Sequence, residues 1–141
     1  MKNLKALGAS VALAVLALVG GAGKAHADIS TMTVLQSSKS GVTPTRTSTG
    51  LVASSRTYKA RNDGKLFLLF AKTGAGTCTV TITTPGTVGG IAIADQTVTV
   101  DAINGDRVIG PLPTRIFNDS NGDIQFTLSD TVGLSMTAIK L

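Results

Sequence analysis

The sequence lacks or has very little of several residue types that enzyme active sites often use. It has no glutamate and no tryptophan, and it has only one histidine, His26, and one cysteine, Cys78. Histidine is the usual general base and a common metal ligand. We expect the segment that contains His26 to be removed. Ser-His-Asp and Cys-His arrangements, and zinc sites built on histidine or several cysteines, are then excluded from the mature chain. We therefore predict that the protein is not an enzyme and needs no cofactor.

A hydrolase that uses aspartates alone is the one catalytic alternative. All eight acidic residues are aspartates, and such an enzyme would need two of them close together in a pocket. No spacing in the sequence places a pair in this way, so this alternative has little support. Its candidate residues are Asp95, Asp101, Asp106, Asp119, Asp123 and Asp130.

Residues 1–27 have the pattern of a secretory signal. Lys2 and Lys5 precede an apolar run that extends from Ala6 to Gly21, and Ala25 and Ala27 supply the small residues that a signal peptidase reads. We expect cleavage after Ala27, and contact with a membrane only before that cleavage. The alternative is a retained apolar helix that anchors the protein or packs in an assembly, although the run is shorter than the roughly 20 residues that span a bilayer.

Charge and cysteine content limit the mature chain further. Removal of residues 1–27 leaves ten basic and eight acidic residues, a net charge of +2 in place of +5. These charges are scattered with few aromatics between them, so we predict no binding to nucleic acid. A single cysteine forms no internal disulfide, although small exported domains usually have several. We expect stability to come from the sheet, from assembly, or from both.

Residues 28–50 are polar and contain few large apolar side chains. We predict an extended arm over this segment, with one short strand at Met32–Leu35.

From Leu51 onward, strand-length runs alternate with turn clusters at a spacing of about 8–12 residues, which is typical of sandwiches and barrels. The pattern in residues 51–141 therefore predicts an all-β domain without a helix. The expected architecture is a small antiparallel β-sandwich or barrel of jelly-roll type with about seven or eight strands. The run Lys65–Ala71 is continuously apolar, so we expect both of its faces to be covered. The expected strands are 51–60, 65–71, 77–83, one or two within 91–100, 107–109, 115–117, 124–128 and 134–141.

The turn from Asp119 to Asp123 is the one weak candidate for a metal site. Asp119, Asn121 and Asp123 place oxygen ligands at positions 1, 3 and 5 of a calcium loop, and Asp130 falls at position 12. However, Ile124 stands where such a loop needs glycine, and aspartate at position 12 is too short for the usual bidentate ligand. We therefore predict no metal site here, and interpret the segment as a polar turn that joins strands 115–117 and 124–128 in a hairpin.

Two further features lie on the predicted strand 77–83. Cys78 falls on its apolar side with Val80 and Ile82, where it is most simply a small buried hydrophobe. Threonines occupy the other side, and threonine is a good strand former on a solvated face. Threonine on an exposed sheet can also form a hydrogen-bonding platform, and this alternative stays open. The threonines concerned are Thr77, Thr79, Thr81 and Thr83, with Thr97 and Thr99 expected beside them.

The stretch from Tyr58 to Leu141 resembles small head proteins of tailed bacteriophages, of the decoration or cement type. The resemblance lies in Asn62-Asp63-Gly64-Lys65 before an apolar strand, in Thr79–Val88, in Ala94–Val100, in Val108-Ile109-Gly110-Pro111-Leu112-Pro113 and in Ile139-Lys140-Leu141. It implies a compact β domain, often a trimer, that sits on the surface of a virion and clamps capsomers together. Its partners would be capsid protein or identical subunits, with the arm 28–50 reaching a neighbour.

The secretory signal predicts a second possibility, because phage heads assemble in the cytoplasm. The protein would then be an exported cell-surface, fibre or coat subunit that assembles by strand addition.

Overall fold

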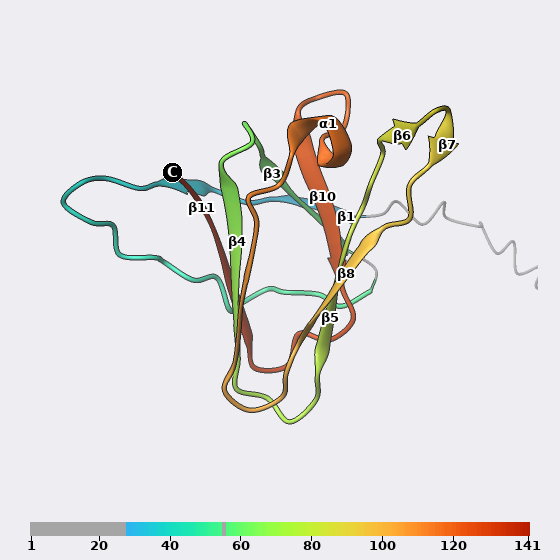
Figure 1. Ribbon diagram of the computed structural model, residues 1–141. Helices are drawn as coiled ribbons and strands as arrows, with labels where there is room; N and C mark the ends of the chain where they lie inside the picture. The colour runs from blue at the N-terminus through green and yellow to red at the C-terminus, as the bar shows by residue number, and fades with distance from the viewer. Residues whose placement is uncertain (1–27, 55) are drawn as a thin grey trace, which may run out of the picture.

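The computed structural model describes residues 28–54 and 56–141 (Figure 1). Within them nearly all regular structure is β, which confirms the all-β prediction. Among these residues no helix is long and apolar enough to cross a bilayer. The elements are β1 Asp28–Thr31, β2 Val34–Gln36, β3 Arg56–Arg61, β4 Leu66–Lys72, β5 Cys78–Ile82, β6 Thr87–Val88, β7 Ile91–Ala92, β8 Gln96–Val100, β9 Gly105–Ile109, α1 Thr114–Phe117, β10 Asp123–Leu128 and β11 Leu134–Lys140.

Two sheets form a sandwich. The five-stranded sheet has the order β1-β3-β10-β5-β8, the four-stranded sheet has the order β2-β11-β4-β9, and β6 and β7 pair as a separate hairpin. Figure 1 shows the two sheets close together at one end and spread apart at the other, where α1 lies. The sheets are antiparallel, as predicted, except at one side of the sandwich, where β1 runs parallel to β3 and β2 runs parallel to β11.

These two parallel pairs also correct the prediction of a separate arm. The chain forms β1 at the edge of one sheet, crosses at Met32 and Thr33, and forms β2 at the edge of the other. Met32 and Val34 pack against the core. Edge strands offer unpaired amides and carbonyls, and the arm satisfies them on both sheets. The segment from Asp28 to Gln36 therefore belongs to the sandwich, and only the loop after β2 remains extended (Figure 1).

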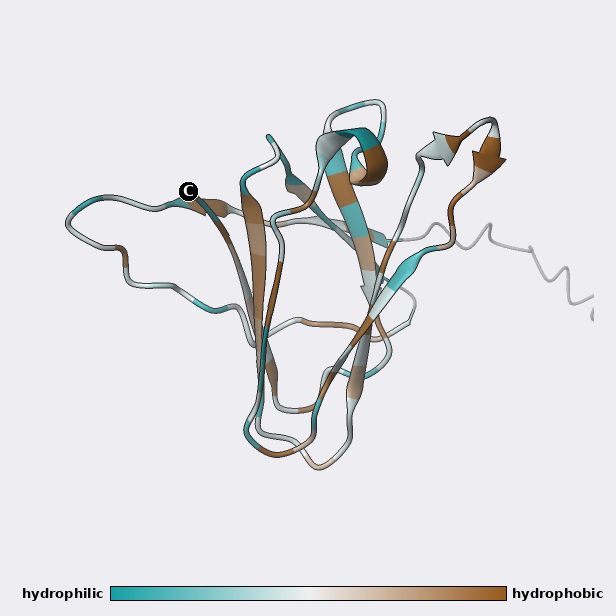
Figure 2. Ribbon diagram, in the orientation of Figure 1, coloured by the Kyte–Doolittle hydropathy of each residue, from teal (hydrophilic) through white to brown (hydrophobic). Residues whose placement is uncertain are grey.

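The core follows from period-2 alternation, which turns successive side chains to opposite faces of a sheet. Cys78, Val80 and Ile82 of β5 are completely buried, as predicted, and Cys78 is an inert part of the core. Phe126 lies at the centre, stacked on Tyr58 with ring centroids 5.5 Å apart and edge-on to Phe70 at 5.9 Å. Figure 2 shows the alternation as brown segments separated by teal and pale ones along β10.

The predicted strand 115–117 is instead the helical turn α1, and the predicted 115–128 hairpin is therefore wrong. Pro113 precedes α1 and its carbonyl accepts the amides of Ile116 and Phe117. Proline has no amide to donate and its fixed φ suits the start of a helix. Phe117 is buried and Ile116 packs against the core, so α1 closes the wide end of the sandwich. The polar turn at 119–122 accordingly joins α1 to β10.

Candidate interaction surfaces

The acidic turn before β10 uses its first carboxylate to hold itself in shape. Oδ1 of Asp119 accepts the amides of Asn121 at 2.8 Å and Asp123 at 3.0 Å, and Oδ2 accepts Nε2 of Gln125 at 2.8 Å. The bond from the amide of Asp123, and then that from Gln125, hold the pKa of Asp119 below its usual value. The carboxylate of Asp123 lies near Lys59 and Arg61 instead, at 3.8 and 3.9 Å. The three predicted oxygen ligands therefore do not converge.

Within residues 28–54 and 56–141 no group of three or more His, Cys, Asp or Glu side chains is placed to hold a metal ion.

Replacing Asp119 with alanine should lower the free energy of unfolding by about 1–2 kcal/mol, because two amides and one side-chain amide lose their acceptor. Urea denaturation measures the change. Asn121→Ala is the matched control, since the structure uses only the main chain of Asn121 in this turn. Equal losses in the two variants would contradict this role for the Asp119 carboxylate.

The predicted threonine rows do lie side by side. Thr79 pairs with Thr99, and Thr81 lies between Thr97 on β8 and Thr127 on β10. These side chains cover the outer face of the five-stranded sheet, together with polar residues such as Lys59 and Gln125. This face has the polar character that a solvated antiparallel sheet normally shows.

The outer face of the four-stranded sheet is different. We define the apolar face as Leu35, Phe67, Leu69, Val108 and Ile139, and none of these residues is charged. Leu66, Leu68 and Phe70 of β4 point into the core, so the alternating residues Phe67 and Leu69 point outward. Ile139 lies between Leu35 and Phe67, and Leu69 lies beside Val108. The apolar face is therefore continuous across all four strands.

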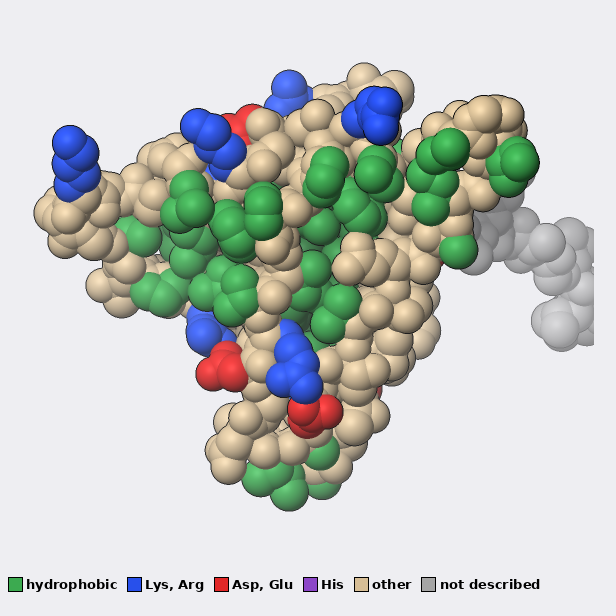
Figure 3. All heavy atoms as spheres, in the orientation of Figure 1, with side chains coloured by type: hydrophobic (Ala, Val, Ile, Leu, Met, Phe, Trp, Pro, Cys, Tyr) green, Lys and Arg blue, Asp and Glu red, His purple; other side chains and the backbone are tan. Residues whose placement is uncertain are grey.

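The prediction that both faces of the run 65–71 are covered holds only in part for the described chain, because the outward side chains of β4 keep some exposure. Phe67, Leu69, Leu35 and Ile139 are only half-buried, and Val108 is 66% exposed. Figure 3 shows hydrophobic side chains gathered over β11 and β4, between the loop at the left and α1. Large continuous apolar surfaces are typical of contact sites, so this face is a candidate interaction surface.

A hollow lies where the arm closes the side of the sandwich. The arm pocket, as we name it, has a volume of about 360 Å³ and lies between β1–β2 and the returning segment at Thr47–Leu51. Tyr58 and Met136 line it and are each only 2% exposed, and Met32 lies beside them. None of the described residues that line the pocket is charged; most of the others are threonines.

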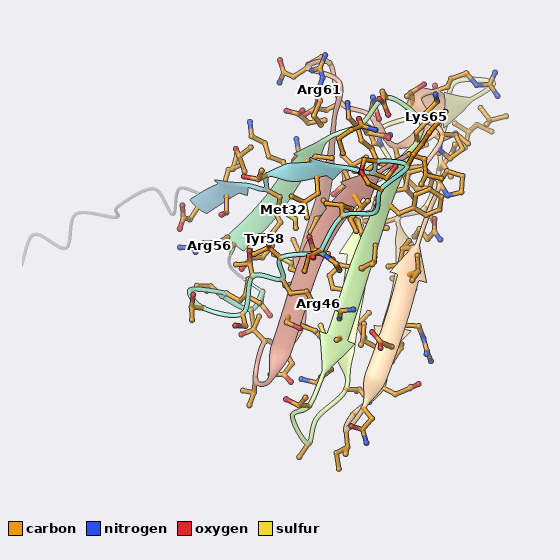
Figure 4. All side chains as sticks on the ribbon, turned by 90° about the vertical axis from the view of Figure 1, so that its left-hand side faces the viewer. Met32, Arg46, Arg56, Tyr58, Arg61 and Lys65 are labelled. Atoms are coloured by element: carbon orange, nitrogen blue, oxygen red, sulfur yellow. The ribbon has the colours of Figure 1, made fainter. Side chains whose placement is uncertain are left out.

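Short polar contacts tie the arm around this pocket. The amide of Val52 donates to Oη of Tyr58 at 2.7 Å, and Arg56 donates to the carbonyl of Gly50 at 2.8 Å and pairs with Asp28. Figure 4 shows Met32 and Tyr58 close together, with Arg56 and Arg46 around them. Arg61 and Lys65 lie at the top of the same view, away from these residues. Among the described residues that line it, the pocket presents mainly threonine hydroxyls and no acid–base pair.

The sequence revealed neither the apolar face nor the arm pocket as a site, although the continuous apolar run of β4 was a signal for the first. The predicted cleavage residues Ala25 and Ala27 lie outside the described residues. The chain matches no family model, and comparisons with curated proteins and with solved structures found no significant match.

Proposed function

We propose that this protein is a non-enzymatic structural subunit that attaches to a larger particle through the apolar face. The observation that carries the proposal is the contrast between the two outer faces of one sandwich. The five-stranded sheet presents threonine, lysine and glutamine to solvent, whereas the four-stranded sheet presents Phe67, Leu69 and Val108. Burial of apolar area stabilises by about 25 cal/mol per Å², so the second face gains most from a partner.

The particle is a virion in our leading version of this proposal, and the subunit decorates its shell. The resemblance to phage head proteins supports this version, as does a small domain with a stable core and no disulfide. A decoration subunit needs only a surface that is complementary to the shell, and two packed sheets supply a rigid surface. Capsid protein is the partner that the apolar face would meet.

An exported surface or fibre subunit is the second version, and one structural observation favours it. The arm adds β1 and β2 in parallel to the edges of both sheets. The same main-chain pairing made to a neighbouring copy would link subunits by strand addition.

Val108→Lys should weaken attachment to the particle at least about tenfold, which corresponds to 1.4 kcal/mol, because a lysine within an apolar interface loses its water without gaining a partner. The measurement is co-sedimentation of the protein with virions purified from cells that carry this sequence. Thr97→Lys is the matched control, since Thr97 is exposed on the opposite, polar face. Loss of attachment in Thr97→Lys but not in Val108→Lys would contradict the proposal, because it would show that the polar face binds the particle.

The intact mass of the natural protein and its location separate the two versions. The virion version expects the protein in purified particles, found by immunoblot. The exported version expects a mass that corresponds to residues 28–141 and recovery outside the cell. Absence from purified virions would overturn the virion version, and presence in them would overturn the exported one.

A further inference from the structure

Three cations at the wide end of the sandwich have no ion-pair partner in the described part of the chain. They are Lys39, Lys65 and Arg115, all of them exposed, and we name them the basic rim. The other seven cations of residues 28–141 each lie within 3.9 Å of an aspartate carboxylate. The positive charge that the fold leaves without a counter-charge is therefore confined to the basic rim.

The basic rim follows one end of the four-stranded sheet. The turn that carries Lys39 comes after β2 and is bonded to the end of β11 through the amide of Ser37. Lys65 is the residue before β4. The helix α1, which carries Arg115, lies against the same turn, because a Cβ added to Gly64 would contact the first residue of α1 at 3.6 Å. Figure 3 shows Lys and Arg side chains along the upper edge of the view, above the hydrophobic ones.

This end is also where the apolar face begins. Phe67 follows Lys65 by two residues, so alternation turns both side chains to the same side. Ile139 pairs with Phe67 and continues the apolar row across β11. Toward the opposite end of the face, Arg46 and Asp106 neutralise each other at 3.4 Å. The outer face of this sheet therefore has an apolar centre, one edge of unpaired cations and one neutral edge.

The aspartates of the described chain leave no carboxylate free to pair with the basic rim of a second copy. Asp95 accepts the amide of Thr84 at 2.8 Å, and Asp119 accepts the amides of its own turn. The other six form ion pairs within the chain: Asp28, Asp63, Asp101, Asp106, Asp123 and Asp130. A partner that satisfies the basic rim must therefore be a different molecule with carboxylates of its own.

We propose that the apolar face docks on a protein surface with an apolar centre and carboxylates along one edge, and that the basic rim pairs with those carboxylates. The inference rests on the proposed function and names the chemistry of the particle surface. Charges at the edge of an interface act mainly on the rate and orientation of association. The subunit then docks in one orientation, with α1 and the start of β4 over the acidic edge.

A protein fits this surface better than an anionic membrane does. Electrostatic attachment to anionic lipid uses clusters of about 4–8 Lys or Arg side chains. The basic rim has three cations, which come from three separate segments of the chain. Its charges therefore suit a few discrete carboxylates beside an apolar contact.

The test compares two triple variants of the full chain that have the same net charge. The rim variant carries Lys39→Gln, Lys65→Gln and Arg115→Gln. The control variant carries Gln96→Glu, Thr97→Glu and Thr99→Glu, at exposed positions of β8 in the other sheet. Each replacement lowers the net charge by one. Association and dissociation rates are measured on immobilised particles purified from cells that carry this sequence, between about 0.05 and 0.5 M NaCl.

The rim variant should associate at least about tenfold more slowly than the natural protein, because it has lost the charges that steer it. The control variant should lose clearly less. Salt should slow association of the natural protein and have little effect on the rim variant, since the charges that salt screens are gone. Equal association rates in the two variants would overturn the inference, and so would association of the natural protein that does not depend on salt.

Phe67→Ala separates this inference from the proposed function. It changes no charge, so it should raise the dissociation rate and leave the salt dependence of association in place. Normal attachment by both Phe67→Ala and Val108→Lys would overturn the role of the apolar face. Normal attachment by the rim variant would overturn only the role of the basic rim.

Two defined probes test the basic rim without any particle. Immobilised poly-L-glutamate should retain the natural protein until salt releases it, and the rim variant should elute before the control variant. Elution of both variants at the same salt concentration would overturn the inference. Phosphatidylserine vesicles should not co-sediment with the natural protein. Co-sedimentation that the rim variant loses would overturn the inference by assigning the basic rim to lipid.

Discussion

Replacing Phe126 with alanine is expected to lower the free energy of unfolding by about 3–5 kcal/mol, the usual cost of removing a buried phenylalanine ring. The ring is completely buried and contacts both Tyr58 and Phe70. Its loss removes an aromatic stack, an edge-on contact and the apolar area of the ring itself. Small domains have a total stability of about 5–15 kcal/mol, so the variant should be close to unfolding. Chemical denaturation followed by circular dichroism measures the change.

Phe67→Ala is the control for this prediction, because it removes the same kind of ring from the outer face of β4. Phe67 is half-buried on the apolar face and not in the core. We expect it to lower stability clearly less than Phe126→Ala and to weaken attachment to the particle. Equal destabilisation by the two variants would show that Phe67 is a core residue and that the apolar face is not a free surface.

Asp130→Asn is expected to have the second largest effect on stability, a loss of about 2–3 kcal/mol. Lys72 is completely buried at the end of β4, and its ammonium donates to Oδ2 of Asp130 at 2.5 Å and to the carbonyl of Val132 at 2.7 Å. Asparagine leaves the buried ammonium without its counter-charge. We place the cost below that of a fully buried pair because the Asp130 side chain is 30% exposed.

The same pair predicts how stability depends on pH. The hydrogen bond from Lys72, and then that from the amide of Val132, lower the pKa of Asp130 in the folded protein. A lowered pKa in the folded state means that the stabilisation is complete above the ordinary value, about 3.9. It is lost as pH falls from there through the lowered value. Unfolding curves between pH 7 and pH 2 should therefore show less acid sensitivity in Asp130→Asn than in the natural protein.

Two further variants test this interpretation. Lys72→Met combined with Asp130→Asn should recover much of the loss, since it removes the stranded charge and keeps an apolar side chain in place. Asp63→Asn should change stability little, because Asp63 and Lys140 form an exposed pair 3.6 Å apart. Failure of the double variant to recover any stability would show that Asp130 acts through the shape of the β10–β11 turn and not through its charge.

Several features of this protein were determined by the sequence itself. Alternation from Thr77 to Thr83 predicted β5, the burial of Cys78 and the position of Thr81 beside Thr97, because period 2 assigns successive side chains to opposite faces. Asp119 predicted the polar turn, since a short carboxylate bonds to amides just after it in the chain. The lack of glutamate, and of histidine after residue 26, is the ground for predicting that the protein is not an enzyme, and this stays a prediction.

Other features were decided only by the tertiary structure. Alternation places Phe67 and Leu68 on opposite sides of β4, but it does not show which side faces the other sheet. The apolar face could therefore be recognised only from the tertiary structure. β1 and β2 join their sheets through main-chain amides and carbonyls. Every residue except proline has both groups, so the side-chain sequence gives little indication of this pairing. The arm pocket depends on where two distant segments cross. α1 replaced a predicted strand because Pro113 started a helical turn that put Phe117 into the open end of the sandwich.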